Sequence, residues 1–220
     1  DWLRSDVVWT FAIAIVFLGL AAALFGHWLE KAGPRKAGVA AAIFWGGGLM
    51  VTSLGVSLHQ LWLIWLGAGV IGGIGLGLGY ISPVSTLIKW FPDRRGLATG
   101  MAIMGFGGGA MIGMPLGDLL ISNYGVGETF FIMGLIYLIA MTIGAFGYRV
   151  PAEGWKPEGW NPVAKKTNNM ISTSHVHVSN AHKTPQFWLL WGVLCLNVSA
   201  GIGVLSVAKP MFQEIAASSF

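Results

Sequence analysis

The sequence predicts an all-α membrane protein, a bundle of transmembrane helices that crosses the bilayer six times. Hydrophobic residues make up 55% of the 220 residues and charged residues only 10%, whereas a soluble domain carries about a quarter charged residues. The apolar residues form uncharged runs of about 20, the length that spans a bilayer as a helix. These runs lack the alternation of a barrel strand, and lipid offers backbone groups no partner, so they are predicted to be helices.

The predicted spans follow from the positions of the uncharged runs. The longest run covers residues 37–88 without Lys, Arg, Asp or Glu, and as one helix it would be roughly 78 Å long. It must therefore fold back, and the polar break at 57–60 divides it. The six predicted spans lie near residues 7–26, 37–57, 61–82, 96–117, 129–148 and 186–208.

The basic residues favour one orientation of these spans. The connections 27–36, 89–95 and 149–183 hold eleven of the thirteen Lys and Arg residues. The exceptions are Arg4, before the first span, and Lys209, after the sixth. By the positive-inside rule the basic connections are cytoplasmic, and the chain starts and ends outside. We expect an integral multi-pass protein of a bacterial cytoplasmic (inner) membrane.

The stretch 150–184 predicts a cytoplasmic linker between two groups of helices, because prolines and glycines precede a polar run. Its histidines, at 175, 177 and 182, have no acidic or cysteine partner, so the sequence predicts no metal site. The lone Cys195 can form no internal disulfide. The sequence has neither a phosphate-binding glycine motif nor a basic stripe. We therefore expect no cofactor, no nucleic-acid partner and no enzymatic activity.

The connection at 26–36 carries the most specific motif in the chain. As a tight hairpin it uses Gly33 to support the turn and Gly26 to let another helix approach closely, and Glu30 lies among three cations. Its spacing resembles the signature loop between the second and third helices of the major facilitator superfamily. The matching positions are Gly26, Lys31, Gly33, Arg35 and Lys36. Glu30 stands where the family usually has Asp, and Trp28 where Leu is usual.

The resemblance implies a helical bundle of major facilitator type, truncated at both ends and covering the family's helices two to seven. Residues 1–149 would then be the N-terminal bundle without its first helix, 150–184 the linker between the halves, and 185–220 the first helix of the C-terminal bundle. The missing C-terminal helices of the same polypeptide are expected partners, beside the lipid bilayer. The activity of such a family is secondary active transport by alternating access.

The connection at 89–95 suggests a conformational gate. Pro92 is expected to end the preceding helix, and Asp93 can cap the next one. In the family an Arg of this loop pairs with the acid of the signature loop, so the resemblance implies that Arg94 or Arg95 pairs with Glu30. A pair formed in only one conformation biases the conformational equilibrium. The alternative is that these arginines only orient the spans.

Glycines recur at four-residue steps in two spans. The third span carries Gly69, Gly73 and Gly77, and the fourth carries Gly105, Gly109 and Gly113. Small residues at this spacing let helices pack closely in lipid. We therefore predict two helix-packing faces, with sliding surfaces for a rocking motion as the alternative.

Three further segments resemble one branch of the superfamily, the oxalate:formate antiporter family. They are residues 83–109, 154–160 and 209–214. The resemblance implies that the substrates are small organic anions, monocarboxylates or dicarboxylates such as formate and oxalate. It also implies an antiporter, with transport coupled to a proton as the alternative.

Polar residues that could touch such a substrate are few. No charged residue lies at the middle of a predicted span, so the cations that bind a carboxylate are expected in the absent second half. The remaining candidates are Tyr80, Asn197 and Ser199, each of which could instead bond a neighbouring helix. A non-transporting membrane sensor or scaffold that keeps the transporter fold is the alternative function.

Overall fold

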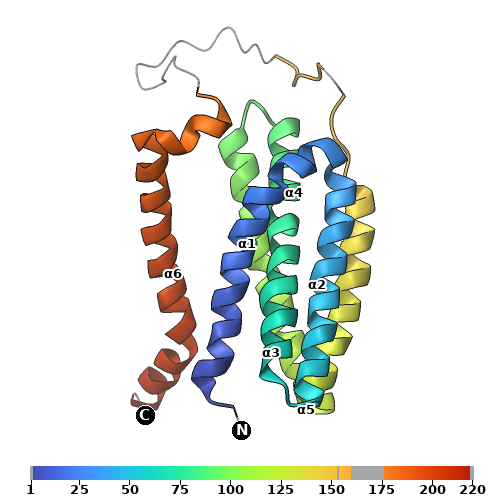
Figure 1. Ribbon diagram of the computed structural model, residues 1–220, viewed down its shortest axis with the longest axis vertical. Helices are drawn as coiled ribbons and strands as arrows, with labels where there is room; N and C mark the ends of the chain where they lie inside the picture. The colour runs from blue at the N-terminus through green and yellow to red at the C-terminus, as the bar shows by residue number, and fades with distance from the viewer. Residues whose placement is uncertain (1, 153, 160–175, 219–220) are drawn as a thin grey trace. The chain divides into compact units, whose positions relative to one another are not determined.

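The computed structural model describes residues 2–152, 154–159 and 176–218 (Figure 1). The chain divides into two compact units, Asp1–Trp160 and Asn161–Phe220. Every regular element in the described residues is a helix. The prediction of an all-α fold is therefore confirmed.

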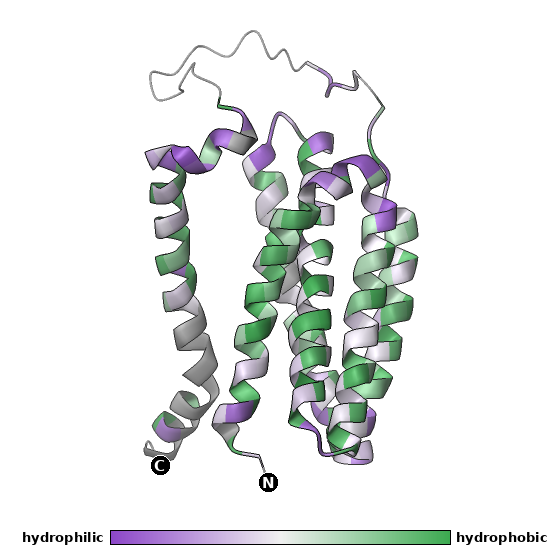
Figure 2. Ribbon diagram, in the orientation of Figure 1, coloured by the Kyte–Doolittle hydropathy of each residue, from purple (hydrophilic) through white to green (hydrophobic). Residues whose placement is uncertain are grey.

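The first unit is a bundle of four long apolar rods (Figure 1). Its elements are α1 (Arg4–Ala32), α2 (Pro34–Ser57), α3 (Leu61–Ile64), the π-helix η1 (Trp65–Ile71), α4 (Gly72–Trp90) and α5 (Arg95–Gly147). The elements α3, η1 and α4 follow one another without a break and make one rod. Within the described residues, all four rods are long and apolar enough to cross a membrane. Hydrophilic residues gather at the ends of the helices (Figure 2).

The rod α5 contains two spans rather than one. It has 53 residues, which would make a straight helix of about 80 Å, but it is interrupted at Gly125, with φ 81° and ψ 173°. That conformation is open essentially to glycine alone. The two halves fold back on each other, since a Cβ on Gly113 would lie 2.9 Å from the Tyr137 hydroxyl and one on Gly117 3.8 Å from Met133 Sδ.

The turn between the predicted spans 96–117 and 129–148 lies at Gly125, but it is shorter than the sequence predicts, because helix continues on both sides of this residue. Before the break, the Ser122 hydroxyl and the Asn123 amide N–H both donate to the Leu119 carbonyl oxygen, at 2.9 and 2.7 Å. After it, the Thr129 hydroxyl donates to the Gly125 carbonyl oxygen at 2.7 Å. These local bonds satisfy polar side chains without a loop, so a single glycine makes the turn.

The third rod is longer than the predicted span 61–82, because α4 continues to Trp90. Pro83 removes one backbone N–H inside the helix. Side-chain bonds flank it: the Ser82 hydroxyl donates to the Pro34 carbonyl oxygen at 3.2 Å, and the Thr86 hydroxyl donates to that of Ser82 at 2.8 Å. The rod has 30 residues and is about 45 Å long, enough to cross both the hydrocarbon core and the headgroup regions.

Glycines bring α2 against α4 and against the second half of α5. A Cβ on Gly75 would lie 2.5 Å from the Trp45 backbone nitrogen, and one on Gly134 would lie 2.9 Å from the Gly46 carbonyl oxygen. Both distances are too short for a real Cβ, so these glycines hold one helix backbone directly against another. Close approach of this kind favours helix association where lipid is the solvent.

One end of the first unit gathers most of its basic residues, whereas Arg4 lies at the start of α1, away from that end. The α1–α2 connection, the α4–α5 connection and the exit of the chain from α5 all lie there (Figure 1). They carry Lys31, Arg35, Lys36, Lys89, Arg94, Arg95 and Arg149. We call this the basic end. The α2–α3 connection and Gly125 lie at the other end, where the Ser53 hydroxyl donates to the Gly127 carbonyl oxygen at 2.7 Å.

The described part of the second unit consists of a 3-10 helix, η3 (Val178–Lys183), and α6 (Pro185–Ser218). The predicted sixth span lies within α6. The Trp188 indole N–H donates to the His182 carbonyl oxygen at 2.8 Å, which ties the start of α6 to η3. Most of the polar run of the predicted linker, residues 160–175, lies outside the described residues.

Candidate functional site

The α1–α2 connection is a one-residue turn at Gly33. Gly33 has φ 84° and ψ 159°, a backbone conformation essentially confined to glycine. Pro34 begins α2 at the first helical position, where a missing N–H costs no hydrogen bond. Four charged residues of the signature loop are exposed at the end of α1 and the start of α2: Glu30, Lys31, Arg35 and Lys36.

Arg35 ties the signature loop to the end of α5. Its Nε–H donates to the Tyr148 carbonyl oxygen at 2.7 Å, between positions 113 residues apart in sequence. Tyr148 is the C-cap of α5, where carbonyl groups lack helical partners and the helix dipole is negative. A cation here therefore satisfies an orphan acceptor. The neighbouring Lys36 has no such bond to any described residue.

A second side chain holds the next carbonyl group along the chain. Trp90, the last residue of α4, donates from its indole N–H to the Arg149 carbonyl oxygen at 2.8 Å. The Trp90 ring also meets Trp155 edge-on, with ring centroids 5.2 Å apart and an interplanar angle of 68°. This geometry is favourable for aromatic pairs. Side chains of α2 and α4 thus hold the chain that leaves α5 against the basic end.

The α4–α5 connection contains an ion pair between neighbours in sequence. Arg94 Nε lies 3.6 Å from Asp93 Oδ2, and the Arg94 side chain is 73% exposed. The predicted capping role of Asp93 is wrong, since Arg94 is the N-cap of α5 and no side chain caps that helix. Asp93 lies one position too early to cap, and its carboxylate pairs with Arg94 instead. Its Oδ1 is buried without a hydrogen-bond partner among the described residues.

The gate expected between Glu30 and Arg94 or Arg95 is not formed in the described part of the chain. The ion pair present there joins Arg94 to Asp93. All three residues of the expected gate are nevertheless exposed at the basic end. Their pairing stays a prediction for another conformation of the protein.

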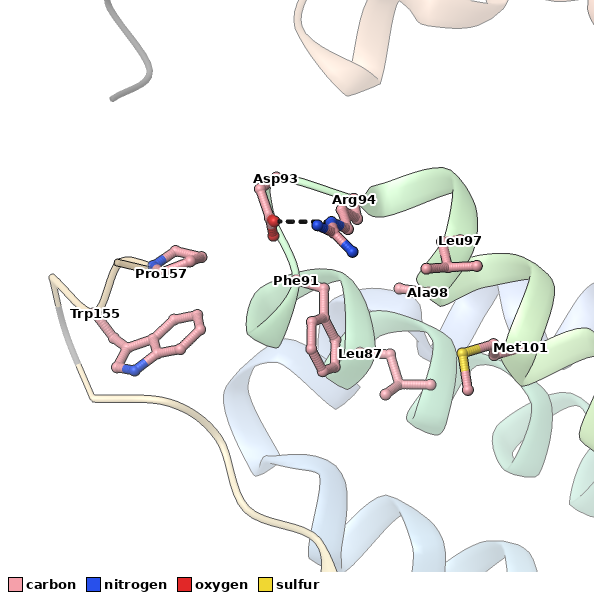
Figure 3. A pocket seen from close by; sticks show the side chains of 9 residues that line it. All are labelled: Leu87, Phe91, Asp93, Arg94, Leu97, Ala98, Met101, Trp155 and Pro157. Carbon is pink, nitrogen blue, oxygen red and sulfur yellow. Dashed lines mark ion pairs between the residues drawn. The ribbon is translucent and has the colours of Figure 1, made fainter. Parts of the chain in front are cut away.

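A cavity of about 600 Å³ lies beside the α4–α5 connection (Figure 3). Its walls come from the end of α4, the start of α5 and the chain that follows α5. They are lined by Leu87, Phe91, Asp93, Arg94, Leu97, Ala98, Met101, Trp155 and Pro157. Apart from the one ion pair these walls are apolar, so the cavity is suited to hydrophobic contact and not to a small free anion.

The first of the two predicted glycine faces lies against α1. Cβ atoms added to Gly69, Gly73 and Gly77 would lie 2.9, 2.7 and 2.5 Å from the nearest atom of α1. Two of those three nearest atoms are backbone carbonyl oxygens. A side chain larger than hydrogen would therefore push α1 away from this rod.

The second predicted glycine face is open. Added Cβ atoms on Gly105 and Gly109 would meet nothing within 4 Å, and Gly113 meets the Tyr137 hydroxyl at 2.9 Å. Gly26, expected to admit a neighbouring helix, also has open space around it. No described helix packs on Gly26, Gly105 or Gly109, whereas Gly113 lies against the second half of α5.

Sequence reasoning missed a third small-residue face, on α2. A Cβ on Gly48 would lie 2.6 Å from the Gly67 carbonyl oxygen in η1. One turn along, Thr52 is fully buried and its hydroxyl donates to the Gly48 carbonyl oxygen at 2.8 Å. The available signal was the four-residue spacing of the small residues Gly48 and Thr52 themselves. The contacts of Trp90 and Trp155 were missed too, and no sequence pattern signals them.

The polar candidates for substrate contact are divided between the units. Tyr80 lies on α4 in the first unit and is 36% exposed. Asn197 and Ser199 are exposed on α6 in the second. In the described ranges, no three His, Cys, Asp or Glu side chains are grouped to hold a metal ion, and His175 lies outside those ranges.

Comparison with known proteins gives the family. The family model described as Major Facilitator Superfamily matches residues 2–219. The chain belongs to this superfamily. The kinship predicted from the signature loop at 26–36 is therefore confirmed, and the four apolar rods make this major facilitator chain an integral membrane protein.

Several curated relatives match this major facilitator chain over most of its length. YhjX, an uncharacterized MFS-type transporter of Escherichia coli (strain K12), is 28% identical over 212 residues, which are 96% of the chain and 50% of the relative. The oxalate:formate antiporter of Oxalobacter formigenes is 30% identical over 84% of the chain and 40% of the relative. Monocarboxylate transporter 2 of Meriones unguiculatus is 26% identical over 84% of the chain and 36% of the relative. The chain thus spans half the length of these relatives or less.

Proposed function

We propose that this chain is part of a secondary active transporter that moves small organic anions by alternating access. The observation that carries the substrate class is the match to the oxalate:formate antiporter, which extends over 84% of the chain. A monocarboxylate transporter among the relatives supports the same class. Oxalate and formate are the first substrates to test. The segments 83–109 and 154–160 support assignment to the oxalate:formate antiporter family and an exchange mechanism.

The basic end faces the cytoplasm in this proposal, and the membrane is a bacterial inner membrane. Seven Lys and Arg side chains gather at that end of the first unit, as the positive-inside rule requires of a cytoplasmic face. Relatives from Escherichia coli and Oxalobacter formigenes support a bacterial setting.

Glu30 is proposed to pair with Arg94 or Arg95 when the basic end closes. All three side chains are exposed at one end of one compact unit, so a movement of either connection can bring them together. An exposed pair contributes less than about 1 kcal/mol. A contribution of that size, made in only one conformation, still shifts the balance between inward and outward states.

The charge of the substrate is proposed to be met mainly by cations in helices beyond this chain. None of the spans here carries a charged residue at its middle. Tyr80, Asn197 and Ser199 then contribute hydrogen bonds to the substrate or to its pathway. Hydroxyl and amide groups can donate to carboxylate oxygens without adding a buried charge.

Counterflow in proteoliposomes tests the proposal. The full-length protein is reconstituted with internal oxalate, and uptake of radiolabelled oxalate or formate is measured against protein-free vesicles. Uptake that requires internal carboxylate supports exchange. Protein that inserts correctly but moves neither anion contradicts the substrate class and favours a sensor or scaffold. Glu30→Gln, compared with Lys36→Gln, tests the gate, and only the first is expected to reduce turnover.

A further inference from the structure

The basic end of the first unit carries an open cleft of about 530 Å³ between the signature loop and the chain that leaves α5. Residues 32–36 of the α1–α2 turn form one side of it, and residues 148–150 form the other. We call it the basic cleft. Its volume falls within the range of small-ligand sites.

Three cations line the basic cleft. Arg35 and Lys36 lie in the first turn of α2, and Arg149 follows the end of α5. All three are exposed, and no Asp or Glu is among the described residues that line the cleft. The ion pair present in the described chain joins Arg94 to Asp93, which lie outside this cleft. The like charges of the cleft therefore lack a counter-charge, and an anion would supply one.

The two arginines of the cleft have unused hydrogen-bond donors. The Arg35 Nε–H donates to the Tyr148 carbonyl oxygen at 2.7 Å, which fixes the guanidinium and leaves its terminal nitrogens without a partner among the described residues. The Arg149 guanidinium has no hydrogen bond or ion pair to a described residue either, since the Trp90 bond ends on the backbone oxygen of Arg149. A guanidinium can donate in parallel to two oxygens of one phosphate.

The basic cleft lies at the depth of lipid headgroups. The helix α2 has 24 residues and is about 36 Å long, whereas the hydrocarbon core is about 30 Å thick. Centred in the bilayer, α2 places its first turn about 3 Å beyond the core, within the headgroup region. The anions at that depth are lipid phosphates. Pro34 and Val150 line the cleft beside the cations, and Val150 is 47% exposed, so apolar contact with a lipid is also available.

A second cleft, of about 370 Å³, shares Tyr148 and Arg149 with the first. Its other walls are mainly apolar and include Pro83, Leu87 and Trp90 of α4. Pro83 lies about 10 Å deeper along the helix than Trp90, so this cleft extends from the headgroup level toward the hydrocarbon core. A ligand with an anionic head and an apolar chain matches the two clefts together, whereas a free anion matches only the first.

We propose that the basic cleft binds the phosphate of an anionic phospholipid, held by the guanidinium groups of Arg35 and Arg149. The bound lipid then bridges the start of α2 and the chain that leaves α5. Basic pockets between helices at a membrane surface recognise anionic headgroups in this way. The inference requires only that this end of the bundle lies at a membrane surface, which the spanning rods provide. It does not depend on the transported substrate or on the direction of transport.

Lipid binding to the detergent-solubilised full-length protein, measured by native mass spectrometry, tests the inference. The probe is phosphatidylglycerol, whose headgroup is anionic. A basic residue beside an anionic lipid raises affinity about fivefold, so Arg149→Gln should weaken the tightest phosphatidylglycerol site by about that factor. Val150→Glu places a carboxylate in the cleft wall and should weaken the site by a similar factor, whereas Val150→Gln should not. Arg35 is left intact, because its bond to the Tyr148 carbonyl oxygen also holds α2 to the end of α5.

Lys89→Gln is the matched control for Arg149→Gln. It removes one positive charge from the same basic end, but Lys89 is exposed and lines neither cleft. Salt screens its charge over such a distance, so the affinity should change by less than about twofold. An unchanged affinity in Arg149→Gln overturns the inference. An equal loss in Lys89→Gln shows a diffuse attraction and overturns it as well, as does a loss of affinity that accompanies lower thermal stability without added lipid.

Two further probes identify the source of the phosphate. Phosphatidylcholine carries a phosphate beside a positive charge, and it should bind more weakly than phosphatidylglycerol. Inorganic phosphate has no apolar chain, so an excess of it should not displace phosphatidylglycerol. Displacement would assign the basic cleft to a free anion and overturn the lipid assignment. Equal affinity for the two lipids would overturn the role of the unpaired cations.

Discussion

A glycine in this bundle is sensitive to substitution when the backbone of another helix lies against it. Glycines in different helices differ sharply in whether they have such a contact. An added Cβ on Gly75 would lie 2.5 Å from the Trp45 backbone nitrogen, whereas one on Gly108 would meet nothing within 4 Å. Gly75→Ala should therefore lower the free energy of unfolding by about 1–3 kcal/mol, the usual cost of overpacking. Thermal unfolding of the detergent-purified full-length protein measures this effect.

Gly108→Ala is the control for that substitution. It lies in a helix and should be neutral or stabilising by up to about 1 kcal/mol, because alanine favours helix over glycine. Equal losses in the two variants would show that helix propensity, and not the contact with α2, decides the outcome.

Two adjacent basic residues of the signature loop also have different roles. Arg35 donates to the Tyr148 carbonyl oxygen, whereas Lys36 has no partner in the described chain. Arg35→Gln should lower the free energy of unfolding by about 1 kcal/mol, and Lys36→Gln should leave it unchanged. Chemical denaturation of both variants checks this. A loss in Lys36→Gln as large as that in Arg35→Gln would mean that charge alone is responsible.

At the scale of elements, two turns of the bundle depend on the same backbone conformation. Gly33 joins α1 to α2, and Gly125 joins the halves of α5, both with φ above +80° and extended ψ. Gly125→Ala should therefore cost about 1–3 kcal/mol of stability. The same substitution at Gly144, which has helical geometry and open space around it, should cost nothing. A tolerated Gly125→Ala would mean that the turn can adopt another geometry.

The existence of each helix was predictable, because charge and the length of the apolar runs decide it. The positions of the helix ends were less predictable, because local geometry decides them. Uncharged runs of about 20 residues located all the rods, because lipid excludes other backbone structures. The ends were placed less well. Helix extends through 118–124 up to Gly125 and through Pro83 to Trp90, since local side-chain bonds support it there. A hydropathy pattern contains no information about those side-chain hydrogen bonds.

The candidate site was predictable only in part. The signature spacing identified the loop and the family, because that motif is specific. It did not identify the acceptor of the Arg35 bond, which lies 113 residues away in sequence and is a backbone oxygen that any residue would supply. The contact between Trp90 and Trp155 is equally hidden, because tertiary structure alone brings the two rings together.

For the whole molecule, the positions of the basic residues lead to a prediction of topology. In a Cys195→Ala background, Lys36→Cys at the basic end should be protected from an impermeant maleimide in intact cells and labelled after lysis. Gln60→Cys, in the α2–α3 connection at the other end, should be labelled in intact cells. Both parent side chains are exposed. The reverse pattern would invert the proposed orientation and remove the cytoplasmic gate.

The π-helix η1 changes which side chains of the third rod face each neighbouring helix before and after it. Its closing bond runs from the Gly72 N–H to the Gly67 carbonyl oxygen, five residues apart instead of four. One surplus residue rotates everything beyond it by about 100°. That rotation keeps Gly67 and Gly72 both against Gly48, while Gly69 and Gly73 both meet α1. The extra residue therefore keeps two sets of glycines on the correct sides of the rod. Gly67 and Gly72 face α2, and Gly69 and Gly73 face α1.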